Sequence, residues 1–277
     1  MPELPEVETV VRGLRGPLVG RIILGATTDW PGGLATPDGP IFAARIAGQP
    51  VRSVDRRGKY ILIALDPDTL IIHLKMTGRL YVVPDDAEQH ADRWVHFTFQ
   101  LDNAHQLRFS DSRKFGRVYL VSDPAEVTGG LGPEPLDPAF TLDAFRQRIA
   151  GRTGQLKPLL LNQAFVAGIG NIYADEALFA SQLHPLRRAD TLSEDDIARL
   201  YHAIRQVLAD GVAREGASVN WYRKPDGTKG SAQEGLSAYG RAGQPCPRCG
   251  HPIEKIVVGQ RGTHLCPVCQ PRQTRRY

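Results

Sequence analysis

The sequence lacks any long apolar run. No stretch approaches the roughly 18 consecutive apolar residues of a membrane-spanning helix, and the first residues are acidic rather than apolar. We therefore expect neither a membrane span nor a secretory signal. Among the 277 residues, the apolar share (42%) and the charged share (23%) are ordinary for a globular protein. This length allows two domains, or one large domain with an appendage.

Cysteine is scarce: the chain has four, all between positions 246 and 269. Such clustering excludes a disulfide framework spread over the fold and suits a reducing cytoplasm. Cys246 and Cys249, then Cys266 and Cys269, form two Cys-x2-Cys pairs separated by sixteen residues. This spacing predicts a zinc ribbon with one structural Zn2+, because two tight turns supply a tetrahedral set of thiolates. The alternative is two disulfides or four free thiols.

A large excess of charge of one sign is also missing, since the whole chain carries only +4. The charge is unevenly distributed, however. Residues 241–277 carry +6, and the remaining 240 residues carry −2. A basic C-terminal module on a near-neutral body favours a nucleic acid as the partner, with a solvated basic tail as the alternative.

Apolar periodicity divides the chain into a β-rich first half and a helical second half. We predict a helix over residues 4–19 and a loop over residues 30–40, which are rich in Gly and Pro. Residues 129–135 are rich in Gly and Pro and mark a boundary. Beyond it we predict four helices, at 142–150, 158–162, 173–181 and 195–214, and then a long polar loop at 216–243. Ser193 and Asp196 resemble a capping box for the last helix. Short apolar runs in the first half predict the strands of an antiparallel sandwich or barrel, at 22–26, 51–54, 60–65, 70–74, 79–83, 94–101, 106–110 and 116–121.

The chemistry is expected at the first residues of the chain. If Met1 is removed, Pro2 presents a secondary amine, and an α-amino group titrates at about 7.7–8.0, well below about 10.4 for lysine. The unprotonated amine is a usable nucleophile, with the carboxyl groups of Glu3 and Glu6 close by. The alternative is a plain helix start, in which Pro5 occupies the first turn and the acidic residues face the positive helix N-terminus.

Other segments carry residue types that suit DNA, each with a structural alternative. The glycines of residues 168–171 precede a predicted helix whose N-terminus can bind a phosphate, with Lys157 upstream. Arg261 lies where the tip of the zinc-ribbon hairpin falls and can grip a phosphate. Turns at 75–78 and 113–116 hold a methionine, an arginine and a phenylalanine, which suit a wedge that fills the gap left by an extruded base. Packing glycines, solvated cations and a packed methionine are the alternatives.

In combination these features resemble one family, the bacterial formamidopyrimidine-DNA glycosylases. The motif at residues 2–9, the segment 168–174 and the terminal zinc finger occur in the family's order, and the resemblance spans essentially the whole chain. It implies an α+β fold with a β-sandwich and N-terminal helix over residues 1–131, a helix–two-turn–helix domain over 132–240 and a zinc finger over 241–277. It also implies a bifunctional enzyme of base-excision repair, which excises 8-oxoguanine and formamidopyrimidines and then cleaves the abasic site by β,δ-elimination.

The resemblance implies a role for each matching residue. Pro2 corresponds to the nucleophile that forms a Schiff base with the sugar, and Glu3 to the acid that assists sugar opening. Glu6 is expected to support this site, Lys59 to promote β-elimination, and Arg261 to grip a phosphate near the lesion. The expected DNA contacts are three residues that enter the duplex and five others that bind its backbone: Met76, Arg113 and Phe115, then His73, Arg93, Arg152, Lys157 and Asn171.

Two departures from the family pattern leave alternatives open. Residues 85–93 hold one histidine, His90, where the family has a pair; Trp94 follows, and Arg93 is expected to replace the contact. The middle of the 216–239 loop, which in the family covers the extruded base, also matches poorly. The alternatives are an endonuclease VIII-like glycosylase for oxidised pyrimidines and a non-catalytic zinc-ribbon DNA-binding protein. We expect a monomer that acts on double-stranded DNA with oxidised bases or abasic sites, in the cytoplasm at the bacterial nucleoid.

Overall fold

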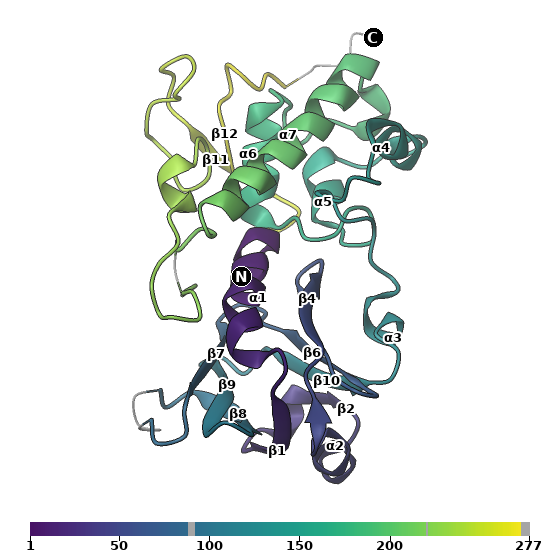
Figure 1. Cartoon of the computed structure of the whole chain (residues 1–277). Coiled ribbons are helices and arrows are strands. Elements are labelled where there is room, and N and C mark those ends of the chain that lie inside the picture. Colours follow the sequence, from purple (N-terminus) through teal and green to yellow (C-terminus); the bar gives the residue numbers. More distant parts are fainter. Residues whose placement is uncertain (88–91, 220, 273–277) are drawn as a thin grey trace. The chain divides into compact units, whose positions relative to one another are not determined.

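The computed structural model describes residues 1–87, 92–219 and 221–272, so His90 and Asn220 lie outside the described residues. The chain forms two compact units (Figure 1). The first comprises Met1–Gly130 with Arg214–Ser231, and the second comprises Leu131–Ala213 with Ala232–Tyr277. Residues 214–231 thus belong to the N-terminal unit, although they follow the last long helix in sequence. The linear division at residues 131 and 240 stays a prediction.

The first unit is built on a sandwich of two five-stranded sheets, which confirms the prediction from alternating apolar runs. The sheet orders are β3-β1-β8-β9-β7 and β2-β10-β6-β5-β4. The rings of Phe97, Phe99 and Phe109 are fully buried between the sheets, because alternate residues of a strand face the same side. The strands are β1 (Ile22–Thr28), β2 (Leu34–Thr36), β3 (Gln49–Pro50), β4 (Ser53–Arg57), β5 (Tyr60–Ala64), β6 (Thr69–His73), β7 (Gly78–Pro84), β8 (Val95–Leu101), β9 (His105–Asp111) and β10 (Arg117–Val121).

Helix α1 (Leu4–Leu18) accompanies the sandwich as predicted and buries an apolar stripe that includes Val7, Val11 and Leu14 in the same core. Strand β2 (Leu34–Thr36) and helix α2 (Gly39–Ile46) both overlap the predicted 30–40 loop, so that prediction was wrong in the middle of the range and at its C-terminal end. The Asp38 carboxylate accepts the N–H of Ile41 at 3.1 Å and caps α2. This unit also contains the 3-10 turn η1 (Pro31–Gly33) and the short helix α3 (Ala125–Thr128).

The second unit begins with four helices, α4 (Leu142–Ile149), α5 (Leu156–Leu161), α6 (Asn171–Ala180) and α7 (Glu194–Ala213), with 3-10 turns η3 (Ala189–Thr191) and η4 (Ala232–Gly235). The capping box predicted for α7 is confirmed. Ser193 Oγ accepts the N–H of Asp196 at 3.2 Å, and the Asp196 carboxylate accepts the N–H of Ser193 at 3.1 Å. Leu200, Ile204 and Leu208 place the apolar face of α7 in the interior of the unit.

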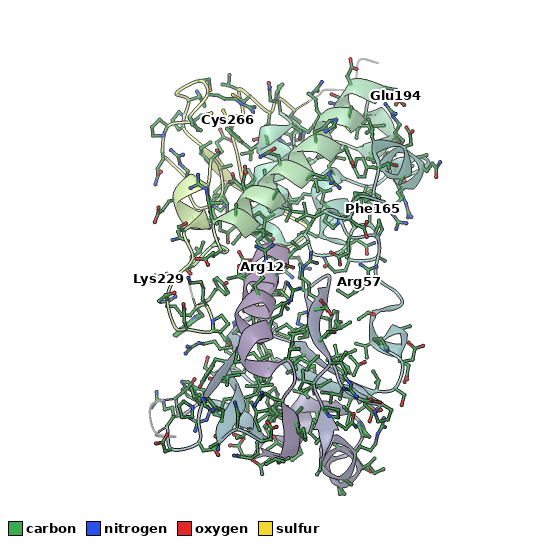
Figure 2. All side chains as sticks on the ribbon, viewed as in Figure 1. Arg12, Arg57, Phe165, Glu194, Lys229 and Cys266 are labelled. Carbon is green, nitrogen blue, oxygen red and sulfur yellow. The ribbon has the colours of Figure 1, made fainter. Side chains whose placement is uncertain are left out.

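The second unit ends in an antiparallel hairpin of β11 (Glu254–Val258) and β12 (Arg261–Leu265), with cysteine pairs on both sides of it in the sequence. Arg261 pairs with Val258 directly beside the hairpin tip, where Gln260 has a left-handed φ of 62°. Figure 2 labels Cys266, which follows the second strand. Within the described residues, no helix combines the length and the apolar character needed to cross a membrane.

Candidate active site and nucleic-acid interface

The N-terminal residues of the first unit form a buried acidic cluster at the start of α1. Pro2 is buried, and Glu3 and Glu6 are 2% and 1% exposed. The Glu6 carboxylate accepts the N–H of Glu3 at 2.8 Å with one oxygen and the N–H of Ala217 at 2.7 Å with the other. Glu6 therefore joins the first residues of the chain to a loop 211 positions away.

The segment Arg214–Ser231 is anchored so that its backbone reaches Glu6. Its two ends are joined by a hydrogen bond from the N–H of Ser231 to the carbonyl of Arg214 at 2.9 Å. Gly216 has a φ of +80°, and a Cβ atom there would lie 2.9 Å from Glu6 Cγ. A larger residue at position 216 would meet both backbone strain and a clash, so glycine allows the close approach.

Lys59 and His73 lie together in the second sheet of the sandwich. Lys59 occupies the two-residue turn between β4 and β5 and is only 5% exposed. The next residue, Tyr60, pairs with His73 across β5 and β6, and their ring centroids are 4.6 Å apart. The backbone N–H of Lys75 donates to His73 Nδ1 at 2.9 Å, which leaves Nε2 as the protonated nitrogen of a neutral ring. Burial, followed by the charges of Lys75 and Lys59, lowers the pKa of His73 to about 3.

We expect the pH dependence of stability to report the neutral His73. Between its folded pKa of about 3 and the ordinary 6.5, the unfolded chain binds a proton that the folded chain does not. Stability should therefore fall as the pH drops below 6.5, and His73 should account for about 1 kcal/mol between pH 7.5 and 5.5. Urea unfolding of the wild type and His73→Gln at both pH values measures this. An equal loss in both proteins would contradict the expectation.

The predicted wedge residues sit on two exposed turns of the first unit. Met76 (38% exposed) precedes β7, and Phe115 (45% exposed) precedes β10. The guanidinium of Arg113 stacks over the Phe115 ring, 4.5 Å from its centroid. Arg93 stacks in the same way over Trp94, at 4.7 Å, and both side chains are exposed. Arginine–aromatic pairs of this kind offer planar surfaces on which bases can stack.

In the second unit the structure brings together three of the residues predicted to contact DNA. Lys157 Nζ donates to the carbonyl of Gly262 at 3.1 Å, and Asn171 Nδ2 donates to the same carbonyl at 3.0 Å. Gly262 follows Arg261, whose own side chain is exposed. The Lys157 ammonium also contacts Asp175 at 2.6 Å and Thr263 Oγ1 at 2.7 Å, and its side chain has no exposed area.

Sequence reasoning missed two acidic residues on α6, of which Asp175 binds the zinc finger and Glu176 binds the segment that precedes it. Asp175 accepts the N–H of His264 at 2.9 Å in addition to the Lys157 ammonium. Glu176 accepts the backbone N–H groups of residues 237, 238 and 239 at 2.8 to 2.9 Å, and burial raises its pKa although these donors oppose the shift. Adjacent acids on a largely apolar helix are the signal that was available. By contrast, the Arg152 side chain is exposed, and its Nε donates to the carbonyl of Arg148 at 3.4 Å.

The four cysteines converge as their spacing predicts. Their Sγ atoms all lie within 4.8 Å of one another, with 3.9 Å between Cys246 and Cys269 and 3.5 Å between Cys249 and Cys266. Sulfurs bound tetrahedrally to Zn2+ at about 2.3 Å would be about 3.8 Å apart, so the donor set fits one zinc ion. With four protein ligands no coordination position stays open, and the zinc is structural.

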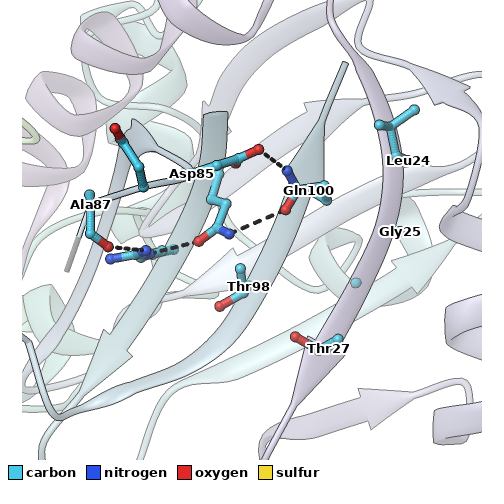
Figure 3. A pocket seen from close by; sticks show the side chains of 11 residues that line it. Leu24, Gly25, Thr27, Asp85, Ala87, Thr98 and Gln100 are labelled. Carbon is cyan, nitrogen blue, oxygen red and sulfur yellow. Dashed lines mark hydrogen bonds between the residues drawn. The ribbon is translucent and has the colours of Figure 1, made fainter. Parts of the chain in front are cut away.

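A pocket of about 730 Å³ lies elsewhere on the first unit, lined by residues of β1, β8 and β9 of the first sheet and by Asp85 to Ala87 (Figure 3). A chain of hydrogen bonds runs along its wall from Asp85 through Gln100 and Gln106 to Arg108, which donates to the carbonyl of Ala87 at 3.0 Å. None of the predicted site residues lines this pocket. It is therefore separate from the candidate active site.

The sandwich with its acidic N-terminus, the helical unit and the four-cysteine hairpin together define a zinc-finger DNA glycosylase. Family models match residues 1–118 as the formamidopyrimidine-DNA glycosylase N-terminal domain, 131–222 as its H2TH domain and 243–272 as the zinc finger found in FPG and IleRS. The chain belongs to the formamidopyrimidine-DNA glycosylase family, and it is a glycosylase/AP lyase of base-excision repair.

Named relatives cover nearly the whole chain. It is 50% identical to the formamidopyrimidine-DNA glycosylase of Herpetosiphon aurantiacus over 98% of this chain and 100% of that protein. A mutant Lactococcus lactis FPG, solved with a Fapy-dG containing DNA, matches with a TM-score of 0.91 at 36% identity, over 98% of this chain and 100% of that chain. The Lactococcus lactis Fpg in complex with an abasic site containing DNA matches with a TM-score of 0.89 at the same identity and coverage.

Proposed function

We propose that the chain excises oxidised purines from double-stranded DNA through a Schiff base on Pro2 and then cleaves the abasic site. The observation that carries the proposal is the buried cluster of Pro2, Glu3 and Glu6, where the Glu6 carboxylate accepts the N–H groups of Glu3 and Ala217. Fapy-dG and abasic sites are the lesions named for the Lactococcus lactis complexes, which supports the same substrates here. Neither alternative function is favoured by the site.

The N-terminal residues divide the chemistry among them. The Pro2 amine attacks C1′ of the damaged nucleotide, and the base leaves with the electrons of the glycosidic bond and a proton. Glu3, as an acid, protonates the sugar ring oxygen and allows the open imine to form. Glu6 has both carboxylate oxygens bonded to backbone donors, so we assign it a positioning role rather than proton transfer.

The residues around β5 and β6 are proposed to cleave the DNA strand and to bind the DNA backbone. The imine acidifies the neighbouring sugar protons, and Lys59 promotes their removal and the loss of the phosphate. His73 is neutral and donates from Nε2, so it binds a phosphate oxygen by a hydrogen bond and not by a charge. Arg261 in the second unit binds a further phosphate through its exposed guanidinium.

The other predicted contacts separate into wedge, surface and positioning residues. Met76, Arg113 and Phe115 are proposed to fill the space that the extruded nucleotide leaves. Arg93 and Arg152 are exposed cations that suit phosphate contacts, as predicted.

Two residues expected to bind phosphate have contacts that argue for another role. The ammonium of Lys157 is completely buried among protein partners and has no surface to offer a phosphate. Asn171 donates to the same carbonyl of Gly262. We propose that both residues fix the backbone beside Arg261, so that its guanidinium is held where the phosphate lies.

We also propose that the protein works in the bacterial cytoplasm, at the nucleoid. Its substrate is chromosomal DNA, and thiolates held for zinc persist in a reducing compartment. The relatives named above are bacterial proteins.

Borohydride trapping tests the proposed function, because borohydride reduces the Schiff base to a stable covalent adduct. Duplexes should carry 8-oxoguanine, an abasic site or an oxidised pyrimidine. We expect adducts with the first two and at least about 10-fold less with the third, since a site that hydrogen-bonds its substrate rejects analogues strongly. A stronger adduct with the pyrimidine would favour the endonuclease VIII-like alternative. No adduct on any duplex would contradict both enzymes.

A further inference from the structure

The two turns that carry the proposed wedge residues share one buried carboxylate, that of Asp111 at the end of β9. Asp111 has no exposed surface. One of its oxygens accepts the hydroxyl of Thr77 and the N–H of Arg113, the latter at 3.2 Å. The other oxygen accepts the N–H of Phe115 at 2.9 Å and that of Gly116 at 2.7 Å. Four donors from two separate turns thus converge on a single side chain.

The backbone of Asp111 holds the same region. Asp111 pairs with Gly78 in the antiparallel ladder of β7 and β9. Gly78 directly follows the turn that holds Met76. Its carbonyl accepts the N–H of Lys114 at 3.1 Å, and its N–H donates to the carbonyl of Trp94 at 2.9 Å. Asp111 therefore fixes the course of both turns through its main chain and its side chain.

A second residue of β9, Phe109, makes both turns pack against one surface. A Cβ atom at Gly78 would lie 2.9 Å from the Phe109 ring, and one at Gly116 would lie 2.3 Å from it. The two glycines, one after each turn, allow both backbones to approach the same buried ring. Both turns therefore rest on the same buried side chain.

We infer that Asp111 is a positioning residue that locks the Met76 turn and the Arg113–Phe115 turn into one rigid wedge. The inference rests on the proposed function, in which these three side chains enter the duplex. Filling the gap beside an extruded base requires side chains already held in place, because ordering them at that moment costs conformational entropy. Asp111 meets this requirement with hydrogen bonds that lie entirely inside the first unit.

The test compares Asp111→Asn and Thr77→Val on two substrates. Asparagine replaces one acceptor oxygen by an NH2 group, which cannot accept a hydrogen bond. Depending on which oxygen is replaced, either the Thr77 hydroxyl and the N–H of Arg113 or the N–H groups of Phe115 and Gly116 lose their acceptor. Excision from an 8-oxoguanine duplex, which needs the wedge, should fall about 10- to 100-fold, the cost expected for hydrogen bonds to a charged group. Thr77→Val, which removes only the bond that ties the Met76 turn to Asp111, should lose about 10-fold. Borohydride trapping on a single-stranded abasic oligonucleotide, which needs no wedge, should stay within about 2-fold of the wild type in both variants.

The control and readouts separate the possible failures. Thr98→Val removes a hydroxyl from β8 at the pocket of Figure 3, touches neither turn, and should behave as the wild type on both substrates. Fluorescence of 2-aminopurine beside the lesion should rise on binding of the wild type and not of Asp111→Asn. If either variant lost as much trapping on the single strand as excision on the duplex, Asp111 would serve folding alone and the inference would be overturned. Excision at the wild-type rate on the duplex would also overturn it. Failure of the wild type to form any adduct would instead overturn the proposed function.

Discussion

Protein that keeps Met1 should form no borohydride-trapped adduct. With Met1 attached, the nitrogen of Pro2 belongs to a peptide bond, and resonance removes the lone pair that an amine would use for attack. Loss of a nucleophile lowers turnover by about 1000-fold or more. Expression with and without inhibition of methionine aminopeptidase yields mixtures of the two forms, and mass spectrometry measures the fraction of chains that begin at Pro2.

The fraction of protein trapped on an abasic duplex should be proportional to the fraction of chains that begin at Pro2. A sample with no such chains should give no adduct. DNA affinity measured without borohydride provides the control, because the exposed cations of the interface are the same in both forms. Efficient trapping in a sample that retains Met1 throughout would exclude Pro2 as the nucleophile. It would leave a lysine as the source of the amine.

Replacing Cys249 with serine should release zinc and abolish DNA binding while the first unit stays folded. A structural zinc contributes about 10–16 kcal/mol to the folding of its module, so three remaining ligands should not hold the hairpin together. The hairpin presents Arg261, and without it we expect at least about 100-fold weaker binding to duplex DNA. Zinc content and fluorescence anisotropy of a labelled duplex measure the two losses.

The positions of the tryptophans make this experiment specific. The chain has three, and Trp30, Trp94 and Trp221 all belong to the first unit. Their emission maximum and urea midpoint should be the same in the wild type and Cys249→Ser. Val268→Ser, at an exposed position between the second pair of cysteines, should keep both zinc and affinity. If zinc-free Cys249→Ser still bound DNA with wild-type affinity, the hairpin would have no role in binding.

Local patterns predicted most of the fold. The stripe that includes Val7, Val11 and Leu14 predicted α1, and alternating apolar runs predicted the sandwich. The cysteine spacing predicted the zinc site because metal ligands in two tight turns leave a signal within a few residues. Helix α2 was not predicted, because its eight residues begin with Gly39 and Pro40. Only Phe42 and Ile46 are buried, which are too few apolar residues to show a helical period.

The organisation of the site depended on contacts that no local pattern carries. Nothing near Lys157 signals that its charge meets Asp175, 18 positions later, and Thr263, 106 positions later. In the same way, Asp111 reads as an ordinary turn residue until Thr77 is found beside it. The packing of residues 214–231 on the first unit is also invisible in the sequence, because those residues follow a helix of the second unit.

The hydrogen bond between Ala217 and Glu6 also has a consequence for the order of events during translation. The two residues are 211 positions apart, so at roughly 5–20 residues per second the ribosome needs about 10 to 40 s after Glu6 to supply its partner. Until then the start of the chain is a nascent end that an aminopeptidase can reach. The removal of Met1 that we propose can therefore precede the hydrogen bond from Ala217 to Glu6, so that the amine of Pro2 is already free when the site is completed.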